Sequence, residues 1–493
     1  MDISKLTIKE ARRALDAKEF SSTDLTDAYL DSIAKKDTEI HAYLEVWAER
    51  AREEAKIADE RIERGESAPL TGIPLAIKDN ILIEGRIASA ASKMLENYRA
   101  SYDASVTKKL KDQGAVFLGR TNMDEFALGA STEYSAFGPT RNPHDVTRVP
   151  GGTSGGSAAA IAADMALGAL GSDTGGSIRQ PSALCGVVGL KPTYGAVSRY
   201  GLIAAASSLD QIGPLTKTVE DAEILFRAIG GHDRRDSTSL PDIERDTKKP
   251  RVIGVPRAII EKGLADDVRE RFERTLTSLK DAQYELRTIE LPNFDYALPV
   301  YYIINPAEVS ANLARFDGIR YGLSVPADDI AAVYEKTRSA GFGPEVRRRI
   351  LIGTYVLSAG YADAYYRKAR EVRALIRADF TRAFDTVDAI VTPTTASPAF
   401  EFNTKSDPVS MYLEDLFTVP CNLAGVPAIS VPSGTVVRPS TSLSFESEPE
   451  GPSLRVEDGT GDSVRLPVGF QIIAPQGCEE TLFALGKDVE KAQ

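Results

Sequence analysis

Two glycine-rich turns that carry hydroxyl groups are the most unusual feature of the sequence. They lie within residues 149–181, VPGGTSGGSAAAIAADMALGALGSDTGGSIRQP, the first over Gly151 to Ser157 and the second over Gly175 to Ser177. Glycine permits backbone shapes and close approaches that a Cβ would block. Two such turns near one another could present hydroxyls and free N–H groups to one point, an arrangement suited to nucleophilic catalysis.

Two other interpretations of these turns exist. A phosphate-binding loop is disfavoured, because no GxxxxGK[ST] run occurs and neither turn carries the lysine that reaches phosphate. For an isolated glycine-rich turn, tight packing alone would be the simpler explanation. Here two hydroxyl-bearing turns lie 24 residues apart, from Thr153 to Ser177, and a lysine precedes them in a strand-like run. That combination favours catalysis.

The lysine is Lys78, at the end of the apolar run in GIPLAIKDN. Burial would disfavour its charged form and lower its pKa, which would make the amine a base. A strand-end lysine that reaches solvent is the commoner fate of a lone lysine, and the residues alone leave this alternative open. Histidine is the usual base for a serine, but His41, His144 and His232 lie away from both turns and GxSxG is absent. A Ser–Lys arrangement explains the residues better.

The elements that must position these groups alternate along the chain. Short apolar runs bounded by glycine and proline begin at Gly72, Gly114, Arg251, Asp388 and Gly425, with helical patterns between most of them. This alternation predicts an α/β fold with a sheet covered by helices on both faces.

The predicted organisation has two parts. Residues 1–66 read as an N-terminal helical arm, and residues 67–493 as one large α/β domain. Within that domain, residues from about 318 to 384 are mainly helical, and the polar stretch from about 436 to 463 is predicted to be a surface insertion that forms a hairpin.

Composition limits the function classes. The chain has 493 residues, 42% of them apolar, and a net charge of −12, which opposes non-specific binding to nucleic acids. It has no run of about twenty apolar residues and no apolar leader, so the expected location is the cytoplasm and no membrane contact is expected. Cys185, Cys421 and Cys478 are widely spaced, so neither a disulfide nor a metal site is indicated.

Two segments of the sequence resemble those of a known family. GGTSGGSAAA and ALGSDTGGSIRQPSALCGVVGLKPTYG are similar to the amidase signature, in which a lysine, a serine in a cis peptide and a nucleophilic serine form a triad. By position these residues are Lys78, Thr153 and Ser177, so a threonine stands where the family usually has serine. The resemblance implies a cis peptide between Gly152 and Thr153 and the amidase-signature fold, with a central mixed β-sheet covered by helices on both faces. The expected oxyanion hole consists of the backbone N–H groups of Thr174, Gly175, Gly176 and Ser177.

Further segments are similar to the A subunits of glutamyl-tRNA(Gln) amidotransferases, among them TNMDEFALGASTEYSAFGPTRNP and RRRILIGTYVLSAGYADAYYRKA. This resemblance implies hydrolysis of glutamine through a serine acyl-enzyme, with Tyr301, Arg349 and Asp415 recognising the polar ends of glutamine. It also implies a heterotrimer with B and C subunits, in which Glu-tRNA(Gln) is held through the B subunit. The chain itself would need no cofactor, while the partner would use ATP and Mg.

Asp124, Glu125 and Arg179 are expected to be structural hydrogen-bonding groups around the site. Two alternative functions stay open on the sequence: a free-standing amidase for another small amide, and a non-catalytic scaffold, which only Thr153 suggests.

Overall fold

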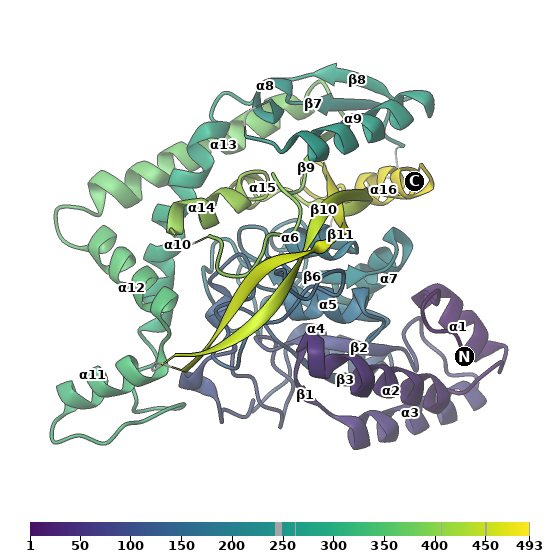
Figure 1. Ribbon diagram of the computed structural model, residues 1–493, viewed down its shortest axis with the longest axis horizontal. Helices are drawn as coiled ribbons and strands as arrows, with labels where there is room; N and C mark the ends of the chain where they lie inside the picture. Colours follow the sequence, from purple (N-terminus) through teal and green to yellow (C-terminus); the bar gives the residue numbers. More distant parts are fainter. Residues whose placement is uncertain (242–248, 262, 406, 449–450, 493) are drawn as a thin grey trace.

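The computed structural model of the chain describes residues 1–241, 249–261, 263–405, 407–448 and 451–492 (Figure 1). Its strands are β1 (Tyr43–Val46), β2 (Pro74–Lys78), β3 (Val116–Thr121), β4 (Gly168–Asp173), β5 (Val188–Lys191), β6 (Gln211–Thr216), β7 (Val252–Val255), β8 (Glu285–Thr288), β9 (Ala389–Pro393), β10 (Ala428–Glu448) and β11 (Gly451–Ile473).

The helices lie between these strands along the chain. They are α1 (Ile8–Asp16), α2 (Ser22–Ile40), α3 (Ala48–Glu63), α4 (Ser105–Asp112), α5 (Gly155–Ala162), α6 (Arg179–Cys185), α7 (Val219–Ile229), α8 (Arg257–Ile260), α9 (Asp266–Asp281), α10 (Ala297–Leu313), α11 (Ile330–Gly341), α12 (Pro344–Leu357), α13 (Lys368–Phe384), α14 (Pro408–Tyr412), α15 (Val419–Ala424) and α16 (Glu479–Lys491). Short 3₁₀ turns are η1 (Lys93–Leu95), η2 (Glu125–Ala127), η3 (Phe294–Tyr296) and η5 (Leu413–Asp415), and η4 (Asp363–Arg367) is a π-helical turn.

The strands form one mixed sheet in the order β1-β3-β2-β4-β6-β5-β10-β11-β9-β7-β8. β2 is parallel to both β3 and β4, and β7 is parallel to both β8 and β9, whereas the remaining neighbours are antiparallel. Every residue of β2, β4 and β6 is buried, so helices and loops cover both faces of the central strands. The predicted mixed α/β sheet is confirmed.

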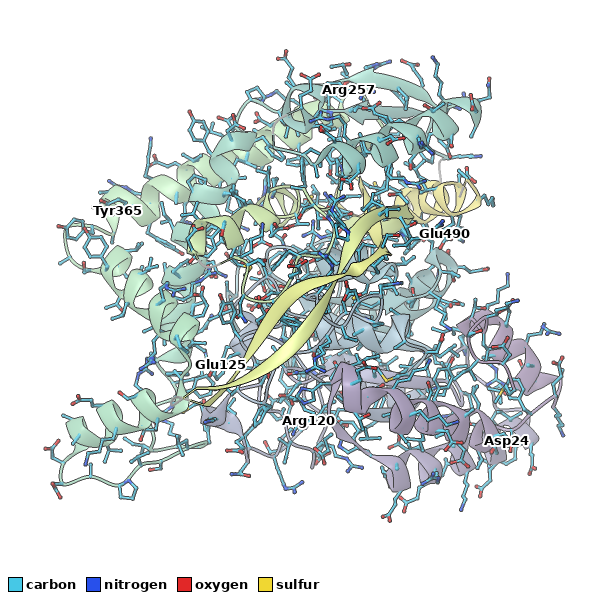
Figure 2. The ribbon with its side chains drawn as sticks, in the orientation of Figure 1. Asp24, Arg120, Glu125, Arg257, Tyr365 and Glu490 are labelled. Atoms are coloured by element: carbon cyan, nitrogen blue, oxygen red, sulfur yellow. The ribbon has the colours of Figure 1, made fainter. Side chains whose placement is uncertain are left out.

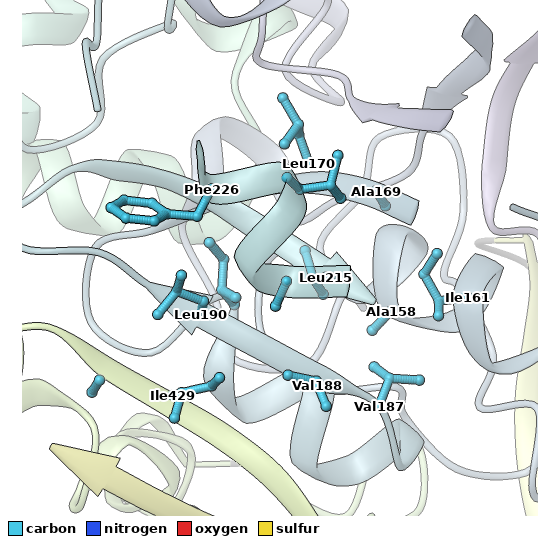
Figure 3. Packing of buried hydrophobic residues seen from close by; sticks show 14 of the residues in the cluster. Ala158, Ile161, Ala169, Leu170, Val187, Val188, Leu190, Leu215, Phe226 and Ile429 are labelled. Atoms are coloured by element: carbon cyan, nitrogen blue, oxygen red, sulfur yellow. The ribbon is translucent and has the colours of Figure 1, made fainter. Parts of the chain in front are cut away.

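The core around the central strands consists of small and branched side chains. Figure 3 shows Leu170 of β4, Leu215 of β6 and Val188 of β5 packed with Ala158 and Ile161 of α5. Because α5 is rich in alanine, it can lie close to the sheet, and the turn before α5 is therefore held at the sheet edge.

Two features differ from the simple two-part organisation or add to it. The first 66 residues contain β1 as well as helices, because Tyr43 and Val46 pair with β3 at the edge of the sheet. β10 and β11 pair antiparallel from Ala428 and Ile473 out to Glu448 and Gly451, across most of the expected insertion. The domain boundaries themselves stay predictions.

Candidate active site

The lysine at the end of β2 is fully buried. Lys78 has 0% exposed area, and β2 and its parallel neighbour β4 end at the same edge of the sheet, which brings Lys78 beside Ser172. Burial lowers the pKa of Lys78 to about 7, against the opposing attraction of Asp124, Asp173 and Asp210. An amine with this pKa can be neutral at physiological pH, as a general base must be.

Three hydroxyl groups surround the Lys78 amine. Nζ lies 2.7 Å from Thr153 Oγ1, 2.8 Å from Ser154 Oγ and 3.0 Å from Ser172 Oγ. Ser154 Oγ donates to the Ser172 carbonyl at 3.1 Å, and Asn80 Nδ2 donates to Ser172 Oγ at 3.0 Å. Because a hydroxyl has one proton, Ser154 can only accept a hydrogen bond from Lys78 in this arrangement.

The two glycine-rich turns contact each other. The Ser154 N–H donates to the Ser177 carbonyl at 3.1 Å. A Cβ on Gly152 would lie 3.3 Å from Ser177 Cα and only 2.4 Å from Pro181 Cδ, so no larger residue fits there. Ser177 is 7% exposed, whereas Thr153 and Ser154 are 0% exposed. Ser177 is thus the hydroxyl of the two turns that a substrate can reach most easily.

The peptide bond between Gly152 and Thr153 is trans, as are all peptide bonds in the described part of the chain. The expected cis peptide is therefore wrong for this structure. Positive φ values at Gly151 (+85°) and Gly152 (+49°) turn the backbone here instead, which only glycine does at little cost.

A buried ion pair flanks the turn that carries Ser177. Arg179 Nε and Nη2 each lie 3.0 Å from a carboxylate oxygen of Asp173, and both side chains are 0% exposed. Burial acts to raise the pKa of Asp173, but the charge and hydrogen bonds of Arg179 outweigh it, and the pKa falls to about 2. Arg179 also donates to Gln471 Oε1 at 2.7 Å and to the Thr418 carbonyl at 2.9 Å. Arg179 thus has the structural role that the sequence suggested.

The turn over residues 174–177 keeps its N–H groups available. Thr174 Oγ1 donates to Asp210 at 2.7 Å, and Thr418 Oγ1 donates to the Gly175 carbonyl at 2.6 Å. Among the described residues, none accepts a hydrogen bond from the N–H of Thr174, Gly175, Gly176 or Ser177. The turn is therefore held through a side chain and a carbonyl, and the hydrogen bonds described here do not use its N–H groups.

Tyr301 lies against this turn. A Cβ on Gly175 would be 2.7 Å from the Tyr301 hydroxyl, and Asn305 Nδ2 donates to the same hydroxyl at 3.3 Å. The Tyr301 ring meets the Tyr302 ring edge to face, with centroids 5.0 Å apart. The first predicted substrate residue thus lies next to the turn that carries Ser177.

Arg349 and Asp415 meet at Tyr302. The Arg349 guanidinium lies 4.7 Å from the Tyr302 ring centroid and 4.8 Å from that of Tyr412, and its Nε is 2.7 Å from a Glu345 carboxylate oxygen. The Tyr302 hydroxyl donates to Asp415 at 3.0 Å. Burial raises the pKa of Asp415 to about 7, although the hydrogen bond and Arg349 oppose this shift. A bound cation would restore the ionised carboxylate.

Asp124 and Glu125 hold loops around the site. Asp124 accepts from the N–H groups of Thr132 and Tyr134 at 2.9 Å each. Glu125, labelled in Figure 2, accepts from the Gly343 N–H at 2.8 Å. Burial raises the pKa of both carboxyl groups to about 7. These contacts agree with the structural role expected for both residues.

Sequence reasoning missed several contributors to the site. Ser172 and Asn80 were not singled out, although Ser172 lies near the end of the strand parallel to β2 and Asn80 follows Lys78 by two residues. Carboxyl ends of adjacent parallel strands meet at one edge, and this rule could have identified Ser172. Tyr302 and Glu345 carried no signal beyond their proximity to Tyr301 and Arg349.

Other chemistries find little support in the described ranges. His41, His144 and His232 each bond a backbone carbonyl away from Lys78 and Ser177. Within these ranges, no group of three or more His, Cys, Asp or Glu residues is arranged to hold a metal ion. Nor does any helix described here have the length and apolar character needed to cross a membrane.

Comparisons with known proteins agree with this geometry. A family model described as Amidase matches residues 24–483. The A subunit of glutamyl-tRNA(Gln) amidotransferase from Desulfatibacillum aliphaticivorans is 51% identical over 502 residues, covering 100% of this chain and 98% of the relative. The crystal structure of the A subunit from Thermotoga maritima is similar with a TM-score of 0.76 and 40% identity, covering 100% of this chain and 95% of the other. A peptide amidase from Stenotrophomonas maltophilia gives a TM-score of 0.80 at 28% identity, with 99% and 97% covered.

The fold, the buried lysine with its hydroxyls and the matched family model together define an enzyme of the amidase class. Within that class, the full-length identity of about one half places the chain more narrowly. It belongs to the family of glutamyl-tRNA(Gln) amidotransferase A subunits.

Proposed function

We propose that this chain hydrolyses the side-chain amide of glutamine and supplies the ammonia that converts Glu-tRNA(Gln) to Gln-tRNA(Gln). The observation that carries the proposal is the fully buried Lys78, whose amine lies 2.7 Å from Thr153 Oγ1 and whose pKa is lowered to about 7. The relatives that are about half identical over the full chain bear the name of that amidotransferase, and this supports the choice of substrate.

Proton positions support Thr153 as the relay between Lys78 and Ser177. A neutral amine has two N–H groups and one lone pair. Ser154 can only accept from it, and Ser172 Oγ, which accepts from Asn80, lies 3.0 Å from the amine, farther than Thr153 Oγ1 at 2.7 Å. Thr153 is the nearest hydroxyl, so its proton can point at the Lys78 lone pair while its oxygen accepts the Ser177 proton.

The reaction then proceeds through an acyl-enzyme. Ser177 Oγ, as its proton passes through Thr153 to Lys78, bonds to the amide carbon of glutamine. The free N–H groups of Thr174 to Ser177 stabilise the tetrahedral oxyanion, and one such donor can be worth about 3 kcal/mol of barrier. The proton returns through Thr153 to the leaving nitrogen, ammonia departs, and water cleaves the γ-glutamyl ester by the reverse path.

Glutamine would be recognised by the tyrosine-lined cluster beside the turn. In this proposal Arg349 would bind the α-carboxylate and Asp415 the α-ammonium, while Tyr301, which lies against Gly175, would contact the substrate next to Ser177. The raised pKa of Asp415 fits a carboxylate that awaits a cationic partner.

The amidotransferase as a whole would be a heterotrimer with B and C subunits. This chain has a net charge of −12 and no GxxxxGK[ST] loop, so activation of the tRNA-bound glutamate by ATP and Mg, and the hold on Glu-tRNA(Gln), fall to the partner. We place the assembly in the cytoplasm, where its tRNA substrate is used.

The test measures glutamate and ammonia released from glutamine by the purified chain, with and without the B and C subunits. Lys78→Ala and Ser177→Ala should abolish release, and a fluorophosphonate probe should label Ser177. Faster hydrolysis of another small amide than of glutamine, in the absence of partners, would indicate a free-standing amidase. An unlabelled Ser177 in the wild-type chain would indicate a scaffold.

A further inference from the structure

Aromatic and aliphatic side chains are exposed together on the outer face of α12, on η4 and in the turn between them. Tyr355 is 50% exposed, Tyr361 42% and Tyr365 40%, and Leu351, one turn before Tyr355, is 71% exposed. The Tyr355 and Tyr361 ring centroids are 4.6 Å apart, and those of Tyr361 and Tyr365 are 5.9 Å apart. Figure 2 shows Tyr365 projecting from the edge of the molecule. We call Leu351, Tyr355, Tyr361 and Tyr365 the tyrosine patch.

This patch is more than scattered surface hydrophobicity. Single exposed apolar residues need no explanation, but a contiguous group of them marks an interaction site. The three rings contact one another and thereby restrict their own motion, so little side-chain entropy would be lost on binding. Tyrosine and arginine are also the residue types enriched at protein interfaces.

The charge around the patch selects the partner. Over residues 347–371, five basic side chains are exposed against two acidic ones, in a chain whose net charge is −12; the basic ones are Arg347, Arg348, Arg367, Lys368 and Arg370, and the acidic ones are Asp363 and Glu371. Arg348, Arg367 and Lys368 pair with Glu345, Asp363 and Glu371, so among the described residues the excess positive charge lies on Arg347 and Arg370. A second copy of the chain would bring two such basic patches face to face, because a two-fold contact pairs a surface with itself. RNA would suit the charge and the rings, but not Leu351 and Ile352, which are 71% and 37% exposed.

We infer that the tyrosine patch and its basic rim dock a protein partner whose own surface presents acidic side chains around apolar anchors. The inference rests on the proposed function, in which this chain works with B and C subunits, and it assigns the surface that holds them.

The same helix connects this surface with the substrate site. Arg349 and Glu345 lie on the buried face of α12, whereas Leu351 and Tyr355 lie on its exposed face. α12 packs so closely on α10 that a Cβ on Gly353 would be 1.9 Å from the Pro306 carbonyl oxygen. A partner on the outer face would therefore restrain both helices that carry substrate residues.

The experiment measures the binding of the purified chain to co-expressed B and C subunits. Leu351→Asp combined with Tyr361→Ala should weaken binding by about thirtyfold or more, because it removes two anchors and adds a like charge to the acidic partner. Arg347→Glu with Arg370→Glu should slow association and reduce its salt dependence. Ile57→Asp, at a 53% exposed position on α3, is the matched control and should bind as wild type.

Glutamine hydrolysis by each isolated variant separates docking from activity and from folding. The KM and kcat of the Leu351/Tyr361 variant alone should equal those of the wild-type chain, since neither residue touches the substrate site. Binding that survives both sets of substitutions would overturn the docking surface and leave the glutaminase proposal standing. A wild-type chain that hydrolyses glutamine but binds neither subunit would overturn the docking surface and the partner model together. If the variants lost self-association and kept subunit binding, the patch would belong to a contact with a second copy. If they lost tRNA retention and kept subunit binding, the patch would belong to an RNA contact. Either result would overturn the inference.

Discussion

Lys78 touches neighbouring hydroxyls on Thr153 and Ser154, and these two hydroxyls differ in where their protons go. The proton of Ser154 is used on the Ser172 carbonyl, so Ser154 helps to orient the amine without exchanging a proton with it. Thr153 has no such commitment and lies in the turn that packs on Ser177. The distances from Lys78 Nζ, 2.7 Å to Thr153 and 2.8 Å to Ser154, do not distinguish the roles of the two hydroxyls. The hydrogen bond that Ser154 donates to the Ser172 carbonyl does distinguish them.

Substitutions at these two positions should therefore have different effects on kcat. Thr153→Val keeps the shape but removes the hydroxyl, and it should lower kcat by about a hundredfold or more, the usual share of a positioned proton transfer. Thr153→Ser should keep most of the activity. Ser154→Ala removes one hydrogen bond to the amine and should cost about tenfold or less. Steady-state glutaminase kinetics check the series, and a larger loss for Ser154→Ala than for Thr153→Val would assign the relay to Ser154.

The pH dependence should report the base. Because Lys78 must be neutral to accept a proton and its pKa is lowered to about 7 by burial, kcat/KM should rise with pH below about 7 and level off above it. Lys78→Arg should be inactive at every pH, since a guanidinium stays charged. A profile that rises only near the ordinary lysine pKa would contradict the lowered pKa of Lys78, and a profile with no rise at all would remove the neutral amine from the mechanism.

The residues that carry the proposed chemistry could largely be predicted from the order and spacing of residue types in the sequence. A lysine at the end of an apolar run is a sequence signal because burying a charge is costly. Two glycine-rich turns are a second signal, because glycine loses more conformational freedom on folding than other residues do. Ser172 and Asn80 could not be predicted in the same way, since a serine and an asparagine at strand ends are common. The prediction of a cis peptide was wrong. It rested on the family resemblance alone and on no property of residues 150–154.

Among the elements, five strands lie in the runs that were expected to form strands, whereas β1, β4, β5, β6 and β8 were not singled out from the sequence. The runs from Gly72, Gly114, Arg251, Asp388 and Gly425 contain β2, β3, β7, β9 and the start of β10. β4, with the sequence GALGSD, has low strand propensity and gave no signal. Its small residues have a packing reason: a Cβ on Gly171 would lie 2.8 Å from Ser154 Oγ. The small residues that lower the strand propensity of β4 therefore also leave room for the Ser154 hydroxyl.

Helix α12 should set the affinity for glutamine through Arg349. Arg349→Ala should raise KM by about thirtyfold or more, because a charge-assisted bidentate contact is lost and the pKa of Asp415 rises further without the opposing charge of Arg349. Arg349→Lys should rescue only part of the loss, since an ammonium lacks the planar, bidentate donor pair that the guanidinium presents beside the stacked rings of Tyr302 and Tyr412.

Thermal unfolding of the Arg349 variants serves as the control for a merely structural effect. An unchanged KM in a folded Arg349→Ala protein would place the carboxylate of glutamine elsewhere.

At the scale of the whole molecule, the isolated chain should be an incomplete amidotransferase. With ATP and Glu-tRNA(Gln) it should form no Gln-tRNA(Gln), and addition of B and C subunits should restore the conversion. The reason is physical: the net charge of −12 opposes binding to phosphate backbones, and the sequence has no ATP-binding loop of the GxxxxGK[ST] type. Acid-gel separation of the aminoacyl-tRNA products checks this, and conversion by the purified chain alone would contradict the partner model.

The fold class followed from the alternation of elements, but the strand order did not. Local patterns report which segments form strands and are silent about which distant strands become neighbours. β5 and β10 pair in the middle of the sheet although more than two hundred residues separate them. Pairings of that kind depend on the tertiary fold, and no motif in the sequence announces them.

The pairing of β5 with β10 makes the order of synthesis matter. As the chain leaves the ribosome, the strands and turns that bear Lys78, Thr153 and Ser177 emerge in the first part of translation. The groups that brace Arg179 are Asn422 and Gln471, near the end of the chain. Until those two residues are made, the buried Arg179 guanidinium lacks two of its hydrogen-bond partners. The turn that carries Ser177 therefore cannot reach its final conformation early in synthesis. The nascent chain should therefore be unable to hydrolyse glutamine until nearly all of it has been translated, which prevents release of ammonia by unfinished chains.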